Sequence, residues 1–160
     1  MDSYSPSLLD KLLPFDAGDA QGLHVRYSKE RIKDSVARDI EMLLNCRATQ
    51  TSDLFGELPN VARSHLTMGL MDISSMSLAS DADRQRITDA IKEALLTHDR
   101  RLAQVEVSVV ATAEGSQRLV FAIRANLMLR PDSEPVSFDA VLQPGSNRYE
   151  VSKAARRAAF

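Results

Sequence analysis

Histidine and cysteine are the residue types that most often ligate metals or serve as bases and nucleophiles. The three histidines, His24, His65 and His98, stand far apart in the chain, and none belongs to an HExxH motif or a Cys/His ligand pair. Cys46 is the single cysteine, so it forms no disulfide within the chain and cannot build a zinc site alone. We therefore expect no metal, no cofactor, and a buried, unreactive thiol at Cys46.

Motifs for nucleophilic catalysis and nucleotide binding are also missing from the sequence. Serines are plentiful, but none lies in a G-x-S-x-G elbow or an S-x-x-K motif. Neither G-x-x-x-x-G-K-[ST] nor G-x-G-x-x-G occurs, so the sequence predicts no phosphate-binding loop.

Glycoside hydrolysis, as in a peptidoglycan-cleaving enzyme, is the one catalytic alternative that the acidic residues leave open. It requires two carboxylates about 5–9.5 Å apart in a sugar cleft, one of them with a raised pKa. Glu57, Asp72 and Asp99 are candidates because we expect each in or beside a loop. The sequence has no Trp and only three Tyr to stack on sugars. We predict no catalysis, and solvated, distant positions for Asp72 and Asp99 would exclude this alternative.

The most informative polar stretch is HDRRL, residues 98–102. It places the guanidiniums of Arg100 and Arg101 beside the carboxylate of Asp99, where a predicted helix gives way to a predicted strand. Arginine pairs with carboxylates through two hydrogen bonds and is enriched in protein interfaces. Two interpretations stay open: a surface for a partner, or cations that complement the helix dipole.

Composition predicts one globular domain. The chain has 160 residues, of which 44% are hydrophobic and 26% charged, with a net charge of −2. Lys153, Arg156 and Arg157 make the C-terminal tail basic, but three cations on an acidic chain do not predict nucleic-acid binding. No apolar run approaches the roughly 18 residues of a membrane span, and the N-terminus does not read as a signal peptide. We expect a cytoplasmic protein.

Hydrophobic periodicity predicts helices first and strands afterwards. Helices are expected over residues 29–47, with an i,i+4 pair between Asp34 and Arg38, then over 59–69 and 81–98. From Leu102 the period changes to two. The expected strands cover residues 102–109, 119–129, 138–142 and 148–151. Three helices, an N-terminal short helix and a small antiparallel meander make an α+β fold.

The short N-terminal helix is predicted from apolar residues at helical spacing: Leu8, Leu9, Leu12 and Leu13. Two turns of helix are too short to be stable alone, so this segment must dock on another surface. That surface is either its own domain or a partner, because the Gly- and Asp-containing residues 15–23 read as a flexible linker.

Four segments together resemble the TssE family of type VI secretion baseplates, which is related to lysozyme-like wedge proteins of contractile phage tails. Residues 35–47, SVARDIEMLLNCR, resemble the family's S-V-x-R-D-[LI]-E-x-L-L-N-[TS]-R helix. Residues 7–12, SLLDKL, resemble its S-L-L-[DE]-R-L opening, and residues 69–74, GLMDIS, resemble G-L-P-D-L-S. Residues 99–102, DRRL, stand where the family has Glu-Pro-Arg-Leu, with matches at Arg101 and Leu102.

The resemblance implies a structural role without hydrolysis, in a cytoplasmic baseplate docked at the inner-membrane complex. It implies partners in the wedge, TssF, TssG and TssK, and a connection to the first ring of the TssB–TssC sheath. By resemblance, the helical core bundle of the wedge would contact the junction residues Asp99, Arg100, Arg101 and Leu102. The Leu8–Leu13 helix would dock on a wedge partner.

The resemblance also implies how the sheath could begin, since sheath subunits of these machines exchange strands. A strand from another chain would complete the half-paired meander, and alternate side chains would set its register: Phe138, Ala140 and Leu142. We therefore expect residues 1–27 to form a docking helix and linker, 28–152 the wedge domain, and 153–160 a basic tail.

Overall fold

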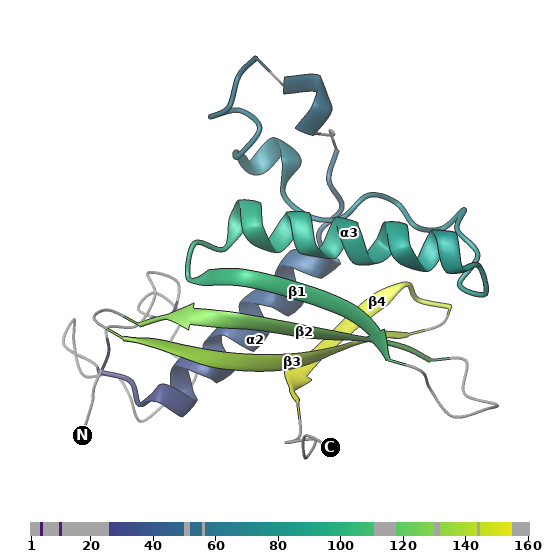
Figure 1. Cartoon of the computed structure of the whole chain (residues 1–160). Helices are drawn as coiled ribbons and strands as arrows, with labels where there is room; N and C mark the ends of the chain where they lie inside the picture. Colours follow the sequence, from purple (N-terminus) through teal and green to yellow (C-terminus); the bar gives the residue numbers. More distant parts are fainter. Residues whose placement is uncertain are drawn as a thin grey trace.

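The computed structural model describes residues 4, 10, 26–49, 52–55, 57–110, 118–129, 132–143 and 145–154. Within these ranges the fold is α+β, with two α-helices and a four-stranded antiparallel sheet (Figure 1). In chain order the elements are α2 (Lys29–Asn45), the 3₁₀ turns η1 (Ser52–Phe55) and η2 (His65–Thr67), α3 (Asp81–His98), β1 (Leu102–Val110), β2 (Leu119–Met128), β3 (Ser133–Gln143) and β4 (Arg148–Lys153).

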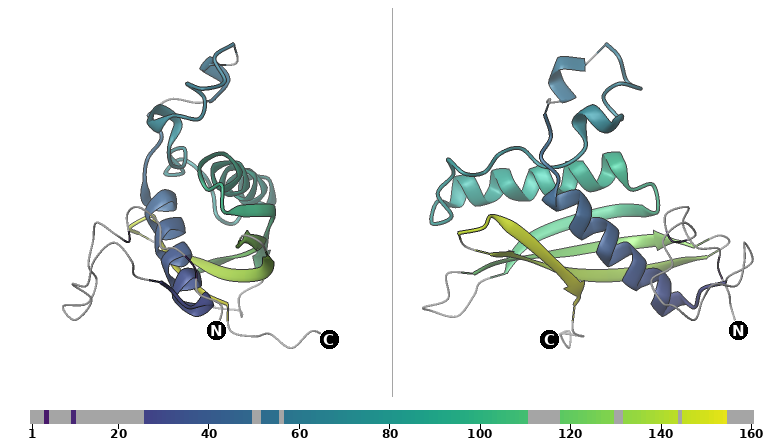
Figure 2. Two further views of the ribbon diagram at one scale, coloured as in Figure 1. Left: turned by 90° about the vertical axis from the view of Figure 1, so that its left-hand side faces the viewer. Right: turned by 180° about the vertical axis from the view of Figure 1, so that it is seen from behind.

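The helices begin where the sequence supplies caps. The hydroxyl of Ser28 accepts the backbone N–H of Arg31 at the start of α2, and Ser80 does the same for Asp83 at the start of α3. α2 ends at Asn45, two residues before the predicted end, whereas α3 has the predicted bounds. α2 crosses one face of the sheet and α3 runs alongside β1 (Figures 1 and 2).

The sheet is a meander in the order β1-β2-β3-β4. Alternate residues of β2 and β3 face the helices and are buried, with Phe121 and Phe138 among the largest fully buried side chains. β3 begins at Ser133, five residues earlier than predicted, and therefore contains Pro135. Proline is tolerated there because β4 ends at Lys153, opposite Phe138, and leaves the first part of β3 without a strand on that side.

The outer edge of β4 is covered by side chains of α2. The amide of Asn45 donates to the carbonyl of Tyr149 at 2.8 Å, and its oxygen accepts the N–H of Tyr149 at 2.9 Å. Glu41 Oε2 accepts the N–H of Val151 at 2.8 Å. These contacts satisfy backbone groups that an edge strand otherwise leaves open to another strand.

The predicted helix over residues 59–69 is wrong. Turns and the three-residue η2 occupy this stretch, and Thr67, Gly69 and the following Leu70 are buried while Leu58 and Leu66 are about half exposed. The large apolar residues of 59–69 are spaced five and two positions apart, at Val61, Leu66 and Met68, so they do not share one helix face. We call residues 47–72 the arm, which rises beyond α3 on the side away from the sheet (Figures 1 and 2).

The two described residues near the N-terminus, Tyr4 and Asp10, both contact the domain. The backbones of Tyr4 and Tyr27 form two hydrogen bonds, of 3.0 and 2.8 Å, and Asp10 packs against α2. The predicted helix residues Leu8, Leu9, Leu12 and Leu13 lie outside the described residues. Among the helices that the structure describes, none is long and apolar enough to span a bilayer.

Candidate functional site

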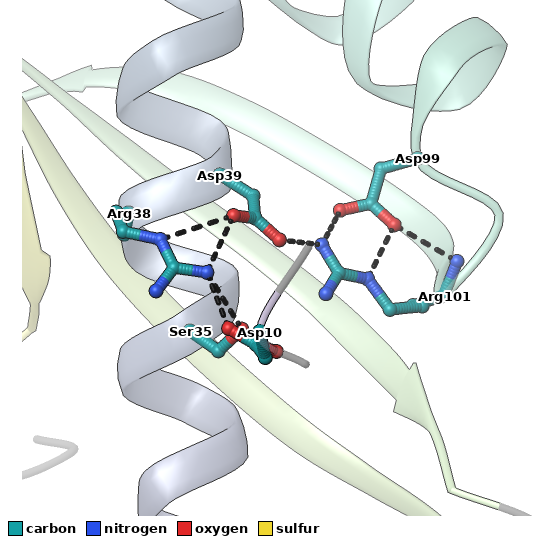
Figure 3. Close-up of polar contacts among 6 residues, drawn as sticks. All are labelled: Asp10, Ser35, Arg38, Asp39, Asp99 and Arg101. Atoms are coloured by element: carbon teal, nitrogen blue, oxygen red, sulfur yellow. Dashed lines mark hydrogen bonds and ion pairs between the residues drawn. The ribbon is translucent and has the colours of Figure 1, made fainter. Parts of the chain in front are cut away.

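The junction between α3 and β1 is held by a bidentate ion pair. Asp99 accepts the backbone N–H and Nε of Arg101 at 3.0 and 2.9 Å, and Arg101 Nη2 donates to its other oxygen at 2.7 Å (Figure 3). The same Nη2 lies 2.9 Å from Asp39 Oδ2 on α2. Arg101 thereby joins the start of β1 to the middle of α2, 62 residues earlier in the chain.

A second arginine continues this network toward the N-terminus. Arg38 Nη2 and Nε donate to Asp39 Oδ1 at 3.0 and 3.3 Å. Arg38 Nη2 also donates to Asp10 Oδ1 at 2.5 Å, and the Ser35 hydroxyl donates to the other oxygen of Asp10 at 2.7 Å (Figure 3). We call the residues of this network the arginine–aspartate cluster: Asp10, Ser35, Arg38, Asp39, Asp99 and Arg101.

Burial makes the cluster a structural clamp. The Asp10 side chain is only 3% exposed, and those of Asp99 and Asp39 are 10% and 19% exposed. Burial by itself lowers the pKa of Arg101, but the hydrogen bonds and charges of Asp99 and Asp39 outweigh it and raise the pKa above its ordinary value. The pKa of Arg38 is raised for the same reason by Asp10 and Asp39. Both guanidiniums stay charged, so they can hold carboxylates but cannot exchange protons near neutral pH.

The cluster brings together three segments that the sequence comparison had singled out separately. Asp10 comes from SLLDKL, Arg38 and Asp39 from the helix signature, and Arg101 from DRRL. Asp39 was not predicted as a partner of Arg101, and Asp34 was predicted as the partner of Arg38. Arg38 instead contacts Asp39 and Asp10, while Asp34 lies 2.6 Å from Lys153. The sequence feature that could have indicated this contact is the adjacent pair of Arg38 and Asp39 in a helix that buries one face.

The predicted junction surface divides into inward and outward residues. Asp99 and Arg101 are engaged within the chain, and Leu102 is 5% exposed in the core. Arg100 is exposed and, with the partly exposed guanidinium of Arg101, forms the side that a partner can reach. The dipole interpretation does not account for Arg101, because its hydrogen bonds go to carboxylates.

The predicted strand-pairing residues need a correction. Phe138, Ala140 and Leu142 are at most 1% exposed, and their strand β3 is paired with β2 on one side and β4 on the other. A strand from another chain cannot pair beside these residues while β4 is in place. Among the described strands the outermost are β1 and β4, and side chains of α2 bind the outer backbone groups of β4; residues 133–137 of β3 extend beyond the end of β4.

The glycosidase candidates do not share a described cavity. Asp72 is exposed, and hydrogen bonds from Ser74 lower its pKa, which is the opposite of what a general acid requires. Asp99 is bound by Arg101, and Glu57 is exposed on the arm.

The histidines and the cysteine form no site in the described part of the chain. His98 Nε2 lies 3.1 Å from the carbonyl of Thr67, and His24 falls outside the described residues. No group of three or more His, Cys, Asp or Glu able to hold a metal occurs among the residues that the structure describes. Cys46 is partly exposed, not buried as expected, because it lies at the C-terminal cap of α2 where the arm begins.

The start of the basic tail belongs to the folded domain. Lys153 Nζ lies 2.6 Å from Asp34 and 3.3 Å from Glu30, while Lys33 bridges Glu30 and Glu134 at 3.0 and 2.6 Å. We call these five residues the surface network. Arg156 and Arg157 lie outside the described residues.

Comparison with known families finds a similarity over most of this structure. The family model of baseplate wedge protein gp25 matches residues 30–132, which include α3, β1, β2 and nearly all of α2. Of the arginine–aspartate cluster, only Asp10 lies outside the matched range. A search of curated proteins gave no significant match.

Proposed function

The chain belongs to the family of baseplate wedge protein gp25, a family of structural proteins that includes TssE, and from this premise we propose that it is a type VI secretion baseplate subunit. It binds the wedge proteins TssF, TssG and TssK, connects them to the TssB–TssC sheath, and helps to initiate sheath polymerisation. It acts in the cytoplasm without catalysis. Residues 1–27 serve as a docking segment, and the wedge domain, predicted over 28–152, includes Lys153 because that residue belongs to β4. The basic tail follows it to residue 160.

The observation that carries this proposal is the difference between the two sheet edges. α2 side chains occupy backbone groups of Tyr149 and Val151 on β4, whereas no described strand pairs with the outer edge of β1. An open edge offers backbone donors and acceptors to a strand from another chain. We place the sheath strand on β1, not on Phe138, Ala140 and Leu142 of β3.

The surroundings of β1 suit an added strand. A groove of about 640 Å³ separates the second half of β1 from the first half of α3. Val107 and Val109 contribute apolar side chains to it, while Arg84 and Gln85 of α3 supply polar ones. An incoming strand with alternating apolar residues would place them over the valines and set its register there.

We assign the surface that faces the wedge proteins to the junction between α3 and β1. Arg101 is held by Asp99 and Asp39 in one orientation, so a partner meets one preorganised guanidinium beside the exposed Arg100. The Leu8–Leu13 segment is proposed to contact a wedge partner while Asp10 fastens it to α2.

Proline scanning of β1 tests the sheath contact. The N–H groups of successive strand residues point to opposite edges, so one of Ser108→Pro and Val109→Pro removes an N–H turned toward β2 and the other removes an outer one. We expect the variant that loses the N–H turned toward β2 to be destabilised. The variant that loses the outer N–H is expected to fold but to lose TssB–TssC binding and sheath initiation in a reconstituted reaction. Val151→Pro is the matched control, because it removes an outer N–H from β4.

The outcomes separate the sheath contact from the function as a whole. Normal sheath initiation by the well-folded proline variant would overturn the placement on β1. Failure of the folded wild-type chain to bind TssF, TssG, TssK and TssB–TssC would overturn the proposed function.

A further inference from the structure

β1 contains a bulge close to the end that joins it to α3. Ala103 pairs with Asn126 of β2, and Glu106 pairs with Arg124. The two residues between them on β1 therefore lie opposite a single residue of β2. An extra residue of this kind interrupts the ladder of hydrogen bonds and bends the strand.

The bulge reconciles two buried residues of β1 with one core. Leu102 and Val105 are 5% and 3% exposed, although they are three positions apart. In a regular strand, residues three positions apart face opposite sides of the sheet. The extra residue turns the strand so that Leu102 enters the core together with Val105, and Val107 then packs against the same core.

Gln104 holds the bulge in a conformation that favours glycine. Its φ is +52°, in the left-handed region that other residue types rarely adopt. The other non-glycine residue with a positive φ in the described part of the chain is Asn147, a type that tolerates this region. The Gln104 side chain supplies what glycine lacks, because its Oε1 accepts a hydrogen bond from Asn126 Nδ2 at 2.5 Å. This bond fastens the bulge to β2.

The bulge divides the outer edge of β1 into two parts. The backbone groups of a strand turn toward one edge at alternate residues, and an extra residue shifts this alternation by one position. A regular incoming strand can therefore match the groups before the bulge or the groups after it, but not both. The part after the bulge, Glu106–Val110, is the longer one and lies beside the groove that Val107 and Val109 line.

We propose that this bulge determines which strands β1 accepts. It confines the sheath strand to Glu106–Val110, and it prevents two copies of the chain from pairing along the whole of β1. Gln104 is thus a specificity-determining residue of the edge. The first part of this inference rests on the proposed function, because it takes the incoming strand from TssB–TssC, whereas self-pairing involves this chain alone.

Deletion of Gln104 tests the proposal because it removes the bulge and little else. Val105 is then the only residue opposite Ala125, and the pairs on either side keep their register. Leu102 and Val105 become two positions apart, so both still face the core. We expect this variant to fold with a regular, uninterrupted edge on β1.

The expected result is self-association of the deletion variant. Pairing along all of β1 adds hydrogen bonds between two copies, so we expect dimers at concentrations about tenfold or more below those that dimerise the wild type. Gln104→Gly is the matched control, because glycine keeps the bulge, and it should behave as the wild type does. Analytical ultracentrifugation measures association, and circular dichroism verifies folding. Adding the outer-edge proline, at Ser108 or Val109, should abolish the new dimer.

Photo-crosslinking maps the sheath strand on the chain with its bulge intact. A photo-crosslinking amino acid at the exposed Ser108 is expected to react with TssB–TssC, and one at Ala103, before the bulge, is not. In the deletion variant both positions are expected to react. The comparison within the wild-type backbone decides the confinement whether or not the deletion variant folds.

The outcomes that would overturn the inference are distinct. A folded deletion variant that associates no more tightly than Gln104→Gly would overturn the protection against self-pairing. Equal crosslinking from Ala103 and Ser108 in the wild-type backbone would overturn the confinement of the sheath strand. Failure of the folded wild type to bind TssB–TssC would overturn the proposed contact with the sheath, and the self-association result would still stand.

Discussion

Two networks of charged side chains are anchored on α2, and they differ in burial and in the type of cation. The arginine–aspartate cluster uses two arginines and places Asp10 and Asp99 almost out of contact with water. The surface network uses Lys33 and Lys153, and two of its three carboxylates, Glu30 and Asp34, are 66% and 60% exposed, whereas Glu134 is 26% exposed. The guanidinium plane allows bidentate geometry, which a lysine ammonium cannot provide.

This difference determines what each network can do for the protein. A buried carboxylate that loses its cation keeps a desolvation penalty that water cannot relieve. An exposed carboxylate that loses its cation is simply rehydrated. The cluster therefore joins Asp10, α2 and the α3–β1 junction, whereas the pairs of Lys153 with Glu30 and Asp34 add little to the joining of α2 and β4.

The largest effect is expected from Asp39→Ala, because it removes the carboxylate shared by both arginines. Breaking a buried ion pair costs about 3–5 kcal/mol, and partial exposure of Arg101 reduces the expected loss here to about 2–3 kcal/mol in the free energy of unfolding. Urea denaturation monitored by circular dichroism measures this loss. Asp34→Ala is the matched control on the exposed side of α2, and an equal loss in both variants would erase the distinction between the networks.

A smaller effect is expected from Asp10→Ala. It leaves Arg38 paired with Asp39 but removes the contacts to Ser35 and Arg38, at a cost of about 1–2 kcal/mol. Hydrogen exchange should then accelerate at Tyr27, whose N–H donates to the carbonyl of Tyr4, while exchange in β2 stays unchanged. Unaltered exchange at Tyr27 would show that Asp10 does not fasten the N-terminal segment.

The smallest effect, about 0.5 kcal/mol or less, is expected from Lys153→Met in the surface network. Hydrogen bonds to Asp34 and Glu30 raise the pKa of Lys153, and those to Glu134 and Glu30 raise that of Lys33, above the ordinary 10.5. Because both values are raised on folding, this stabilisation is complete below pH 10.5 and disappears as the pH rises through the raised values.

Arginine does not titrate in that window, so alkaline denaturation distinguishes the networks. The stability difference between wild type and Lys153→Met should shrink above pH 10.5, whereas that between wild type and Asp39→Ala should persist. The pKa of Glu30 is lowered by its hydrogen bonds to Lys33 and Lys153. The contribution of Glu30 to the free energy of unfolding is therefore present above pH 4.5 and declines at lower pH. A Lys153→Met difference that stayed constant from pH 9 to 11.5 would contradict this assignment.

Local patterns predicted the elements that bury a periodic apolar face. α3 and the strands followed from the 3.6- and 2-residue periods, with errors of one or two residues at most ends. The prediction was wrong at residues 59–69, whose large apolar residues do not share one helix face, and at 133–137, which the predicted strand over 138–142 left out. Pro135 is accommodated in β3 because β4 stops short of it, and the length of β4 opposite β3 is not visible in the local sequence.

The candidate site was only partly predictable for a related reason. Arg101 and Asp99 were singled out by residue type, but Asp39 was not, since the pair spans 62 residues and no local rule connects them. Phe138, Ala140 and Leu142 were correctly placed on a strand but wrongly placed at an open edge. Strand order decides which strands are edges, and strand order is a property of the assembled sheet.

The sequence by itself determined the α+β class, the capped helices, the strand periodicity and, through its resemblance, the wedge family. These depend on interactions between residues close in the chain or on motifs that can be read in order. Only the tertiary structure decided that Asp10, Arg38, Asp39 and Arg101 meet, that α2 side chains bind β4 while no described strand pairs with the outer edge of β1, and that the arm and α3 line a cavity. Each of these contacts joins segments that are far apart in the chain and that come together only when the core packs. Packing of the core determines which polar groups are buried and must therefore find a partner.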